Sequence, residues 1–231
     1  MVITRSTEVP SLARGVERLR PSQPLIAGAP GTRGEGQEGG ILETVKARAS
    51  GPAGMLGAFW AAEAVDTVLG GQLDQFGIVP RTLDGLVGVG AAPFLHAGFG
   101  HLIGNSVPFL ATGLMVGLSG KHKFRDVTII SALVGGLGTW ALGRNATHLG
   151  ASGLVYGYLG YLLTRGIVEK KPLPIALSLL AGGLYGGLLW GVLPGVPGVS
   201  WEGHLFGFLG GVLAARVLPT QESRPETREG S

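Results

Sequence analysis

Three short polar motifs interrupt an otherwise apolar sequence and contain the residue types that acyl-transfer chemistry uses. The motifs are HAGFGHLIGN at residues 96–105, GASGLVY at residues 150–156 and GHLFG at residues 203–207. A serine hydroxyl is a weak nucleophile until a neighbouring base takes its proton, and histidine is the commonest such base. Ser152 is therefore the candidate nucleophile, and His204 is its candidate base.

The first motif supplies candidate donors for the oxyanion that forms during acyl transfer. His101 and Asn105 are four residues apart, so one face of a helix presents both side chains. The backbone N–H of Ser152 is a third donor, because the first turn of a helix has no internal acceptor for its N–H groups. We expect these three groups to form the oxyanion hole.

Membrane helices are the elements that must position these motifs. The chain has 231 residues, of which 45% are hydrophobic, only 14% are charged and 43 are glycine. Such a composition is unusual for a soluble domain, and glycine is frequent where membrane helices pack closely. Six apolar runs are membrane-helix candidates. They cover residues 54–70, 102–118, 127–142, 151–164, 173–192 and 203–215.

These runs predict an all-α integral membrane protein in which residues 51–218 form a compact bundle of six transmembrane helices. Residues 1–50 and 219–231 are polar and aperiodic, and we expect disordered cytoplasmic tails there. With both termini in the cytoplasm, 16 of the 18 Lys and Arg residues fall on the cytoplasmic side. This asymmetry follows the positive-inside rule and argues against a basic surface for nucleic acid.

Helix lengths place the candidate residues at similar depths below the outer surface. Ser152 precedes Arg165 by 13 residues and His204 precedes Arg216 by 12, which corresponds to about 20 and about 18 Å of helix. Asn105 precedes Lys121 by 16 residues, or about 24 Å. All three distances fall short of a hydrocarbon core about 30 Å thick. The sequence therefore predicts a site at the floor of a depression that opens to the outer side.

Small residues at intervals of four predict close approach of the fourth and sixth helices. Gly153 and Gly157 form one such pattern, and Gly203, Gly207 and Gly211 form another. Membrane helices with this spacing bring their backbones close together. His204 flanks the second glycine ridge, so its imidazole is expected to reach the Ser152 hydroxyl.

The three motifs in this order resemble those of the rhomboid proteases, and the resemblance covers about residues 52–218. It implies a Ser152–His204 dyad without a carboxylate, in a bacterial plasma-membrane protein that cleaves transmembrane helices of other membrane proteins and needs no cofactor. It also implies an oxyanion hole made by His101, Asn105 and the Ser152 amide. Supporting roles are implied for Tyr156, which packs against His204, and for His96, Gly150, Gly153 and Gly207.

Several other interpretations of these residues are open. A membrane serine or histidine often only bridges helices, and a rhomboid-like protein that binds membrane clients without cutting them is one alternative function. A small transporter that uses Glu63 and Asp66 is another, although these carboxylates could instead bond the backbone of a loop. We expect His122 and His148 to be surface residues, with His148 near enough to Ser152 to line the cavity.

The sequence lacks the residues that other classes of protease use. The sequence has no cysteine, so it offers no thiol nucleophile. It contains no His-Glu-x-x-His motif, and only Asp66 could serve in an aspartyl intramembrane protease. We therefore expect no metal site. The sequence does not indicate an oligomeric state.

Overall fold

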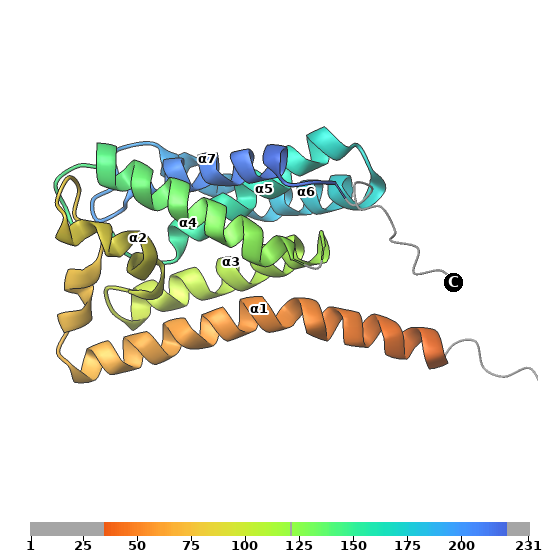
Figure 1. The fold of residues 1–231 in the computed structure, drawn as a ribbon, viewed down its shortest axis with the longest axis horizontal. Coiled ribbons are helices and arrows are strands. Elements are labelled where there is room, and N and C mark those ends of the chain that lie inside the picture. Colours follow the sequence, from red (N-terminus) through yellow and green to blue (C-terminus); the bar gives the residue numbers. More distant parts are fainter. Residues whose placement is uncertain (1–34, 121, 221–231) are drawn as a thin grey trace, which may run out of the picture.

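Helices make up all the regular secondary structure in the part of the chain that the computed structural model describes, residues 35–120 and 122–220. Six of them are long and lie side by side along one direction (Figure 1). These are α1 (Glu35–Val68), α3 (Phe99–Leu118), α4 (Lys123–Leu142), α5 (Ser152–Glu169), α6 (Pro172–Tyr185) and α7 (Trp201–Val217). The short helices η1 (Gln72–Phe76), η2 (Asp84–Leu86), α2 (Gly88–Ala91) and η3 (Ala92–Phe94) connect α1 to α3, and η4 (Gly186–Val192) follows α6.

Each of the six apolar runs coincides with one long helix, α6 being counted together with η4. The expectation of an all-helical chain is thus confirmed for the described residues. By length and hydropathy, two helical segments within these residues qualify as membrane spans, Phe99–Leu118 and Pro172–Val192.

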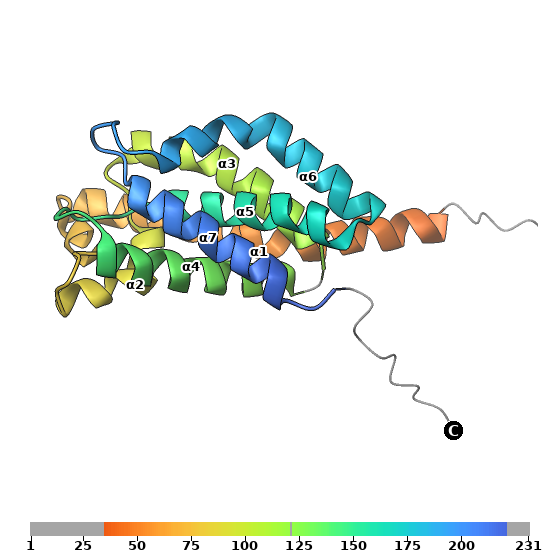
Figure 2. The same ribbon diagram turned by 90° about the horizontal axis from the view of Figure 1, so that it is seen from above.

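Helix α5 is the centre of the bundle, with α3, α4, α6 and α7 around it (Figure 2). Most of its side chains are buried, including the large rings of Tyr158 and Tyr161. Helix α7 is its closest neighbour, because glycines remove the side chains from their interface. A Cβ on Gly207 would overlap the carbonyl oxygen of Gly153, and a Cβ on Gly211 would overlap that of Gly157. The approach predicted from the glycine spacing is therefore the tightest contact in the bundle.

The start of the first helix differs from the sequence prediction. Helix α1 begins at Glu35 rather than near residue 51, so residues 35–50, which we expected in a disordered tail, are helical. Residues 43–50 are mostly exposed, and Lys46 pairs with Glu43 one turn earlier. Because this part of the helix is polar, hydropathy gave no sign of it. Of the predicted C-terminal tail, Pro219 is described and is hydrogen-bonded to the bundle through its carbonyl. Residues 1–34 and 221–231 of the two predicted tails lie outside the described residues.

Two buried carboxylates lie near the end of α1. Asp66 accepts a 2.6 Å hydrogen bond from the backbone N–H of Leu73 in η1, the first short helix after α1. Glu63 is also buried, and its Oε2 has no hydrogen-bond partner among the described residues. The Asp66 bond is of the kind expected if Glu63 and Asp66 bond the backbone of a loop, which was the alternative to a role in transport.

Basic side chains tie the end of α7 to the bundle at the opposite end. The Arg165 guanidinium donates hydrogen bonds to the carbonyls of Ala215, Leu218 and Pro219 at 2.9–3.0 Å. Arg165 also forms a buried ion pair with Glu169. Lys123 donates to the same Pro219 carbonyl at 2.6 Å. Because the last carbonyls of a helix have no partner within it, these contacts satisfy carbonyls at the end of α7 and just beyond it.

Candidate active site

Ser152 is the first residue of α5, and a strained turn places it there. Gly150 has a φ of +113°, which favours glycine. A Cβ on Gly150 would also lie 2.6 Å from Cε1 of His101. The turn therefore depends on glycine for its backbone angle and for the space that it leaves to His101.

The Ser152 hydroxyl and the His204 ring are in hydrogen-bond contact, with 2.9 Å between Oγ and Nε2. The other ring nitrogen, Nδ1, lies 2.9 Å from the carbonyl oxygen of Gly191 in η4. A carbonyl only accepts, so Nδ1 of a neutral ring must carry the proton and Nε2 must be the acceptor. This tautomer is the one that can take the proton of Ser152. A backbone carbonyl, and no carboxylate, therefore orients the imidazole.

Tyr156, one turn after Ser152 in α5, stacks on the His204 ring. The ring centroids are 4.0 Å apart and the planes are inclined by 10°. The tyrosine hydroxyl donates a 2.6 Å hydrogen bond to the Leu188 carbonyl. A Cβ on Gly191 would overlap this hydroxyl and lie 3.3 Å from His204 Nδ1. Helix η4 thus fixes both rings, through positions that sequence reasoning did not single out.

His101 and Asn105 lie on one face of α3, beside Gly150. Nδ1 of His101 accepts the Ala97 N–H at 3.3 Å, which leaves the Nε2–H of a neutral ring free to donate. The Asn105 side chain donates to the His101 carbonyl at 3.2 Å, and its amide carries a second hydrogen. A Cβ on Gly150 would be 3.7 Å from the Asn105 amide nitrogen. Both side chains therefore present a donor toward the turn that precedes Ser152.

His96 is buried beneath this turn and is not in contact with Ser152 Oγ. Its Nε2 accepts the N–H of Ala151 at 3.3 Å, and its ring packs against Phe59 and His101. Burial, followed by the neighbouring His101, lowers the pKa of His96 to about 4. A ring that stays neutral can accept the Ala151 N–H. His96 therefore supports the turn from below.

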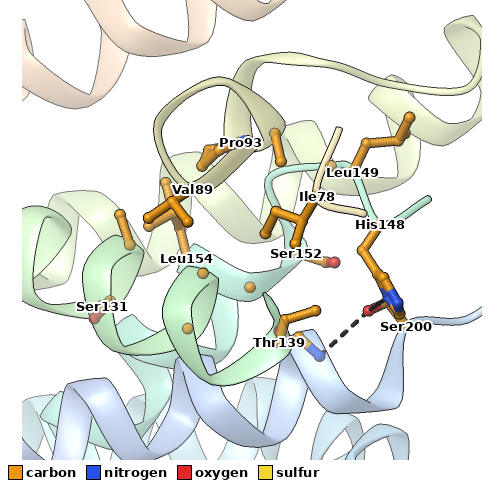
Figure 3. A pocket seen from close by; sticks show the side chains of 17 residues that line it. Ile78, Val89, Pro93, Ser131, Thr139, His148, Leu149, Ser152, Leu154 and Ser200 are labelled. Carbon is orange, nitrogen blue, oxygen red and sulfur yellow. Dashed lines mark hydrogen bonds between the residues drawn. The ribbon is translucent and has the colours of Figure 1, made fainter. Parts of the chain in front are cut away.

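Two cavities adjoin the Ser152 side chain. One of about 620 Å³ opens above it and is lined by His101, Ser152 and His204 together with the loops that precede α5 and α7. The other, of about 50 Å³, lies between the first loop, α4 and α5 (Figure 3). Ser131 and Thr139 line it with hydroxyl oxygens that have no hydrogen-bond partner among the described residues.

Comparison with known proteins identifies the family. The Rhomboid domain family matches residues 85–221, which include all three motifs. The chain belongs to the rhomboid family. Uncharacterized proteins of Mycobacterium tuberculosis and Mycobacterium bovis are each 40% identical over 183 residues, covering 74% of this chain and 76% of theirs. A putative rhomboid protein of Acanthamoeba polyphaga mimivirus is 28% identical over 134 residues, covering 54% of this chain and 71% of its own.

His148, in the loop before Ser152, lines both cavities, as we expected from its place in the sequence. The expectation that it is a surface residue was wrong, because its side chain is buried. Its burial depends on Ser200, a hydrogen-bond partner 52 residues away in the sequence. Glu202, two residues before His204, is also buried, and it accepts the Arg144 N–H at 3.1 Å.

Metal ions need sets of ligating side chains that lie close together. Within residues 43–120 and 122–220, no group of three His, Asp or Glu side chains lies close enough together to hold a metal ion. The His96–His101 pair is held by aromatic packing and by backbone N–H groups instead.

Proposed function

We propose that this rhomboid is an intramembrane serine endopeptidase that cleaves transmembrane segments of other membrane proteins. The observation that carries the proposal is the 2.9 Å contact between Ser152 Oγ and His204 Nε2, with the Nδ1–H of the ring committed to the Gly191 carbonyl. Membership of a family of which many members are serine proteases supports it as well.

Acylation begins when His204 Nε2 takes the Ser152 proton as Oγ attacks the scissile carbonyl. The imidazolium then gives that proton to the leaving amine, so the substrate splits into a free amine and an ester on Ser152. Tyr156 holds the ring parallel to its own during both transfers. The carbonyl of Gly191 takes the place that a carboxylate has in a catalytic triad.

The negative charge of each tetrahedral intermediate is stabilised by three donors. They are the Ser152 backbone N–H, the His101 Nε2–H and the second hydrogen of the Asn105 amide. A donor of this kind contributes about 100- to 1,000-fold to the rate of acyl transfer. Deacylation needs a water molecule, which His204 activates in the same way. The 50 Å³ cavity behind Ser152 is large enough for water, and its two hydroxyls can bond it.

The six long helices cross the membrane with both termini in the cytoplasm. The distribution of Lys and Arg along the chain supports this topology. The site then lies below the outer surface, and the 620 Å³ cavity provides its access to water. A substrate helix has to unwind locally before its carbonyl can be attacked, because helical hydrogen bonds cover it. We therefore expect cleavage near Gly, Ala or Ser residues.

The test compares two serine-to-alanine variants of the full-length purified protein. Ser152→Ala should lose both fluorophosphonate labelling and cleavage of a single-pass membrane substrate in liposomes. Ser178→Ala, on α6 and bonded to the Leu163 carbonyl, should retain both. Persistent cleavage by Ser152→Ala would refute the mechanism. A folded wild-type protein that neither labels nor cleaves would favour the alternative in which the protein only binds its clients.

A further inference from the structure

Three loops of the site meet at His148. Its backbone pairs with Ile78 of the first loop, through N–H···O bonds of 2.8 and 2.9 Å. Its ring lies 2.7 Å from the hydroxyl of Ser200, the residue that precedes α7. Its second ring nitrogen lies 3.0 Å from the Arg144 carbonyl. Figure 3 shows His148 and Ser200 together at the edge of the small cavity, near Ser152.

The hydrogen bonds around His148 have a defined direction. The Arg144 carbonyl can only accept, so Nε2 of a neutral His148 ring carries the proton. Nδ1 is then the acceptor, and the Ser200 hydroxyl donates its proton to it. The imidazole is thus held at both nitrogens, and one of its two partners belongs to the loop before α7.

Ser200 connects this contact to the helix that carries His204. Its Oγ accepts the N–H of Gly203 at 3.2 Å and so caps the N-terminus of α7. Its carbonyl accepts the N–H of His204 itself at 3.1 Å. The Ser200 hydroxyl therefore donates to His148 and accepts from the first turn of α7.

The His148–Ser200 contact joins two positions that have the same sequence separation from the reactive residues. His148 precedes Ser152 by four residues, and Ser200 precedes His204 by four. The two segments are joined a second time by Arg144, whose N–H bonds to the buried Glu202 carboxylate. The His148–Ser200 bond thus links the backbone that leads to the nucleophile with the backbone that leads to the base.

We propose that His148 is a positioning residue, which acts through Ser200 to hold His204 at bonding distance from Ser152. This inference rests on the proposed function, because it concerns the geometry of that reaction. His148 itself does not touch the substrate carbonyl in this role. Its loss should slow the reaction of Ser152 while the protein remains folded.

The experiment is a double-mutant cycle on the full-length protein in detergent, with the rate of fluorophosphonate labelling as the readout. His148→Phe keeps a ring but cannot bond Ser200, and Ser200→Ala removes the other partner. We expect each to slow labelling by about tenfold or more, and the double variant to be no slower than Ser200→Ala, because coupled residues are not additive. His148→Asn, whose amide oxygen can replace Nδ1 as acceptor, should recover most of the rate.

His122→Phe is the matched control, since His122 is an exposed histidine at the opposite end of the bundle. It should label at the wild-type rate. Thermal unfolding of each variant checks that the compared proteins are folded. If His148→Phe does not fold, the labelling rates of Ser200→Ala and His148→Asn are compared instead: slow labelling of the first and near-wild-type labelling of the second support the proposal. Wild-type or faster labelling of His148→Phe, additive effects, or no rescue by His148→Asn would overturn the proposal. Unreactive wild-type protein would instead overturn the proposed function on which it rests.

Discussion

Gly150→Ala is the substitution whose effect the structure defines most sharply. A residue with a side chain at the Gly150 φ of +113° is strained, at a cost of about 1–3 kcal/mol. The new Cβ would also lie 2.6 Å from Cε1 and 2.9 Å from Nε2 of His101. To restore an ordinary contact of 3.4 Å with Cε1, the ring of His101 has to move by about 0.8 Å.

This movement displaces a proposed oxyanion donor by nearly 1 Å. A misplacement of that size can cost about 100-fold in rate, so fluorophosphonate labelling of Ser152 should slow by about that factor. The backbone strain should separately lower Tm by about 2–12 °C, at about 2–4 °C per kcal/mol for a chain of this length. Both quantities are measured on the same detergent-solubilised protein.

Gly195→Ala separates the two effects. Gly195 has a φ of +137°, but no atom lies within 4 Å of the position that its Cβ would take. Gly195→Ala should therefore lower Tm comparably and label at the wild-type rate. In a His101→Ala background, Gly150→Ala should slow labelling no further, because the crowded ring is gone. Equal labelling rates of Gly150→Ala and Gly195→Ala would refute the explanation that a displaced His101 ring slows the reaction.

Three further variants test separate parts of the site and bundle. Tyr156→Phe keeps the ring on His204 and should label within a few-fold of the wild-type rate. Tyr156→Ala loses the stacked ring and should label more slowly by about tenfold or more. Equal labelling rates of the two variants would contradict a role for stacking. Asn105→Ala should lower the acylation rate about 100-fold and leave Tm unchanged, as expected for the loss of one oxyanion donor. A lower Tm with an unchanged acylation rate would indicate that Asn105 has a structural role instead. Arg165→Met removes the partner of Glu169 and of the Ala215 and Leu218 carbonyls, at about 3–5 kcal/mol, so Tm should fall clearly in differential scanning fluorimetry. Arg216→Met, in the last turn of α7, should leave Tm nearly unchanged.

The sequence predicted the helices and their order because the apolar runs are long and the charges lie between them. It also predicted that Ser152 and His204 would lie close together, from the lengths of their helices and from the glycine spacing of the fourth and sixth helices. In the structure these residues gather with His101 and Asn105 around one turn.

What the sequence did not predict depends on contacts between distant segments. His148 has an ordinary loop sequence around it, and only the fold brings Ser200 to its ring. Gly191 lies in a glycine-rich run where nothing distinguishes it from Gly186 or Gly187, yet its carbonyl fixes the tautomer of His204. The polar start of α1 was missed for a different reason, because its sequence contains too few apolar residues to show a helical period.

The bond between His204 and η4 ties the tautomer of the imidazole to α6, a helix that is largely not buried. Only Leu177 and Ala181 of α6 are buried, and η4 follows that helix directly. A displacement of α6 that carries η4 outward removes the acceptor of the Nδ1 proton and the partner of the Tyr156 hydroxyl together. Without that acceptor the imidazole proton is no longer held at Nδ1, and Nε2 is no longer held as the atom that accepts from Ser152 Oγ. The position of η4 therefore sets the His204 tautomer and the Tyr156 hydroxyl contact together.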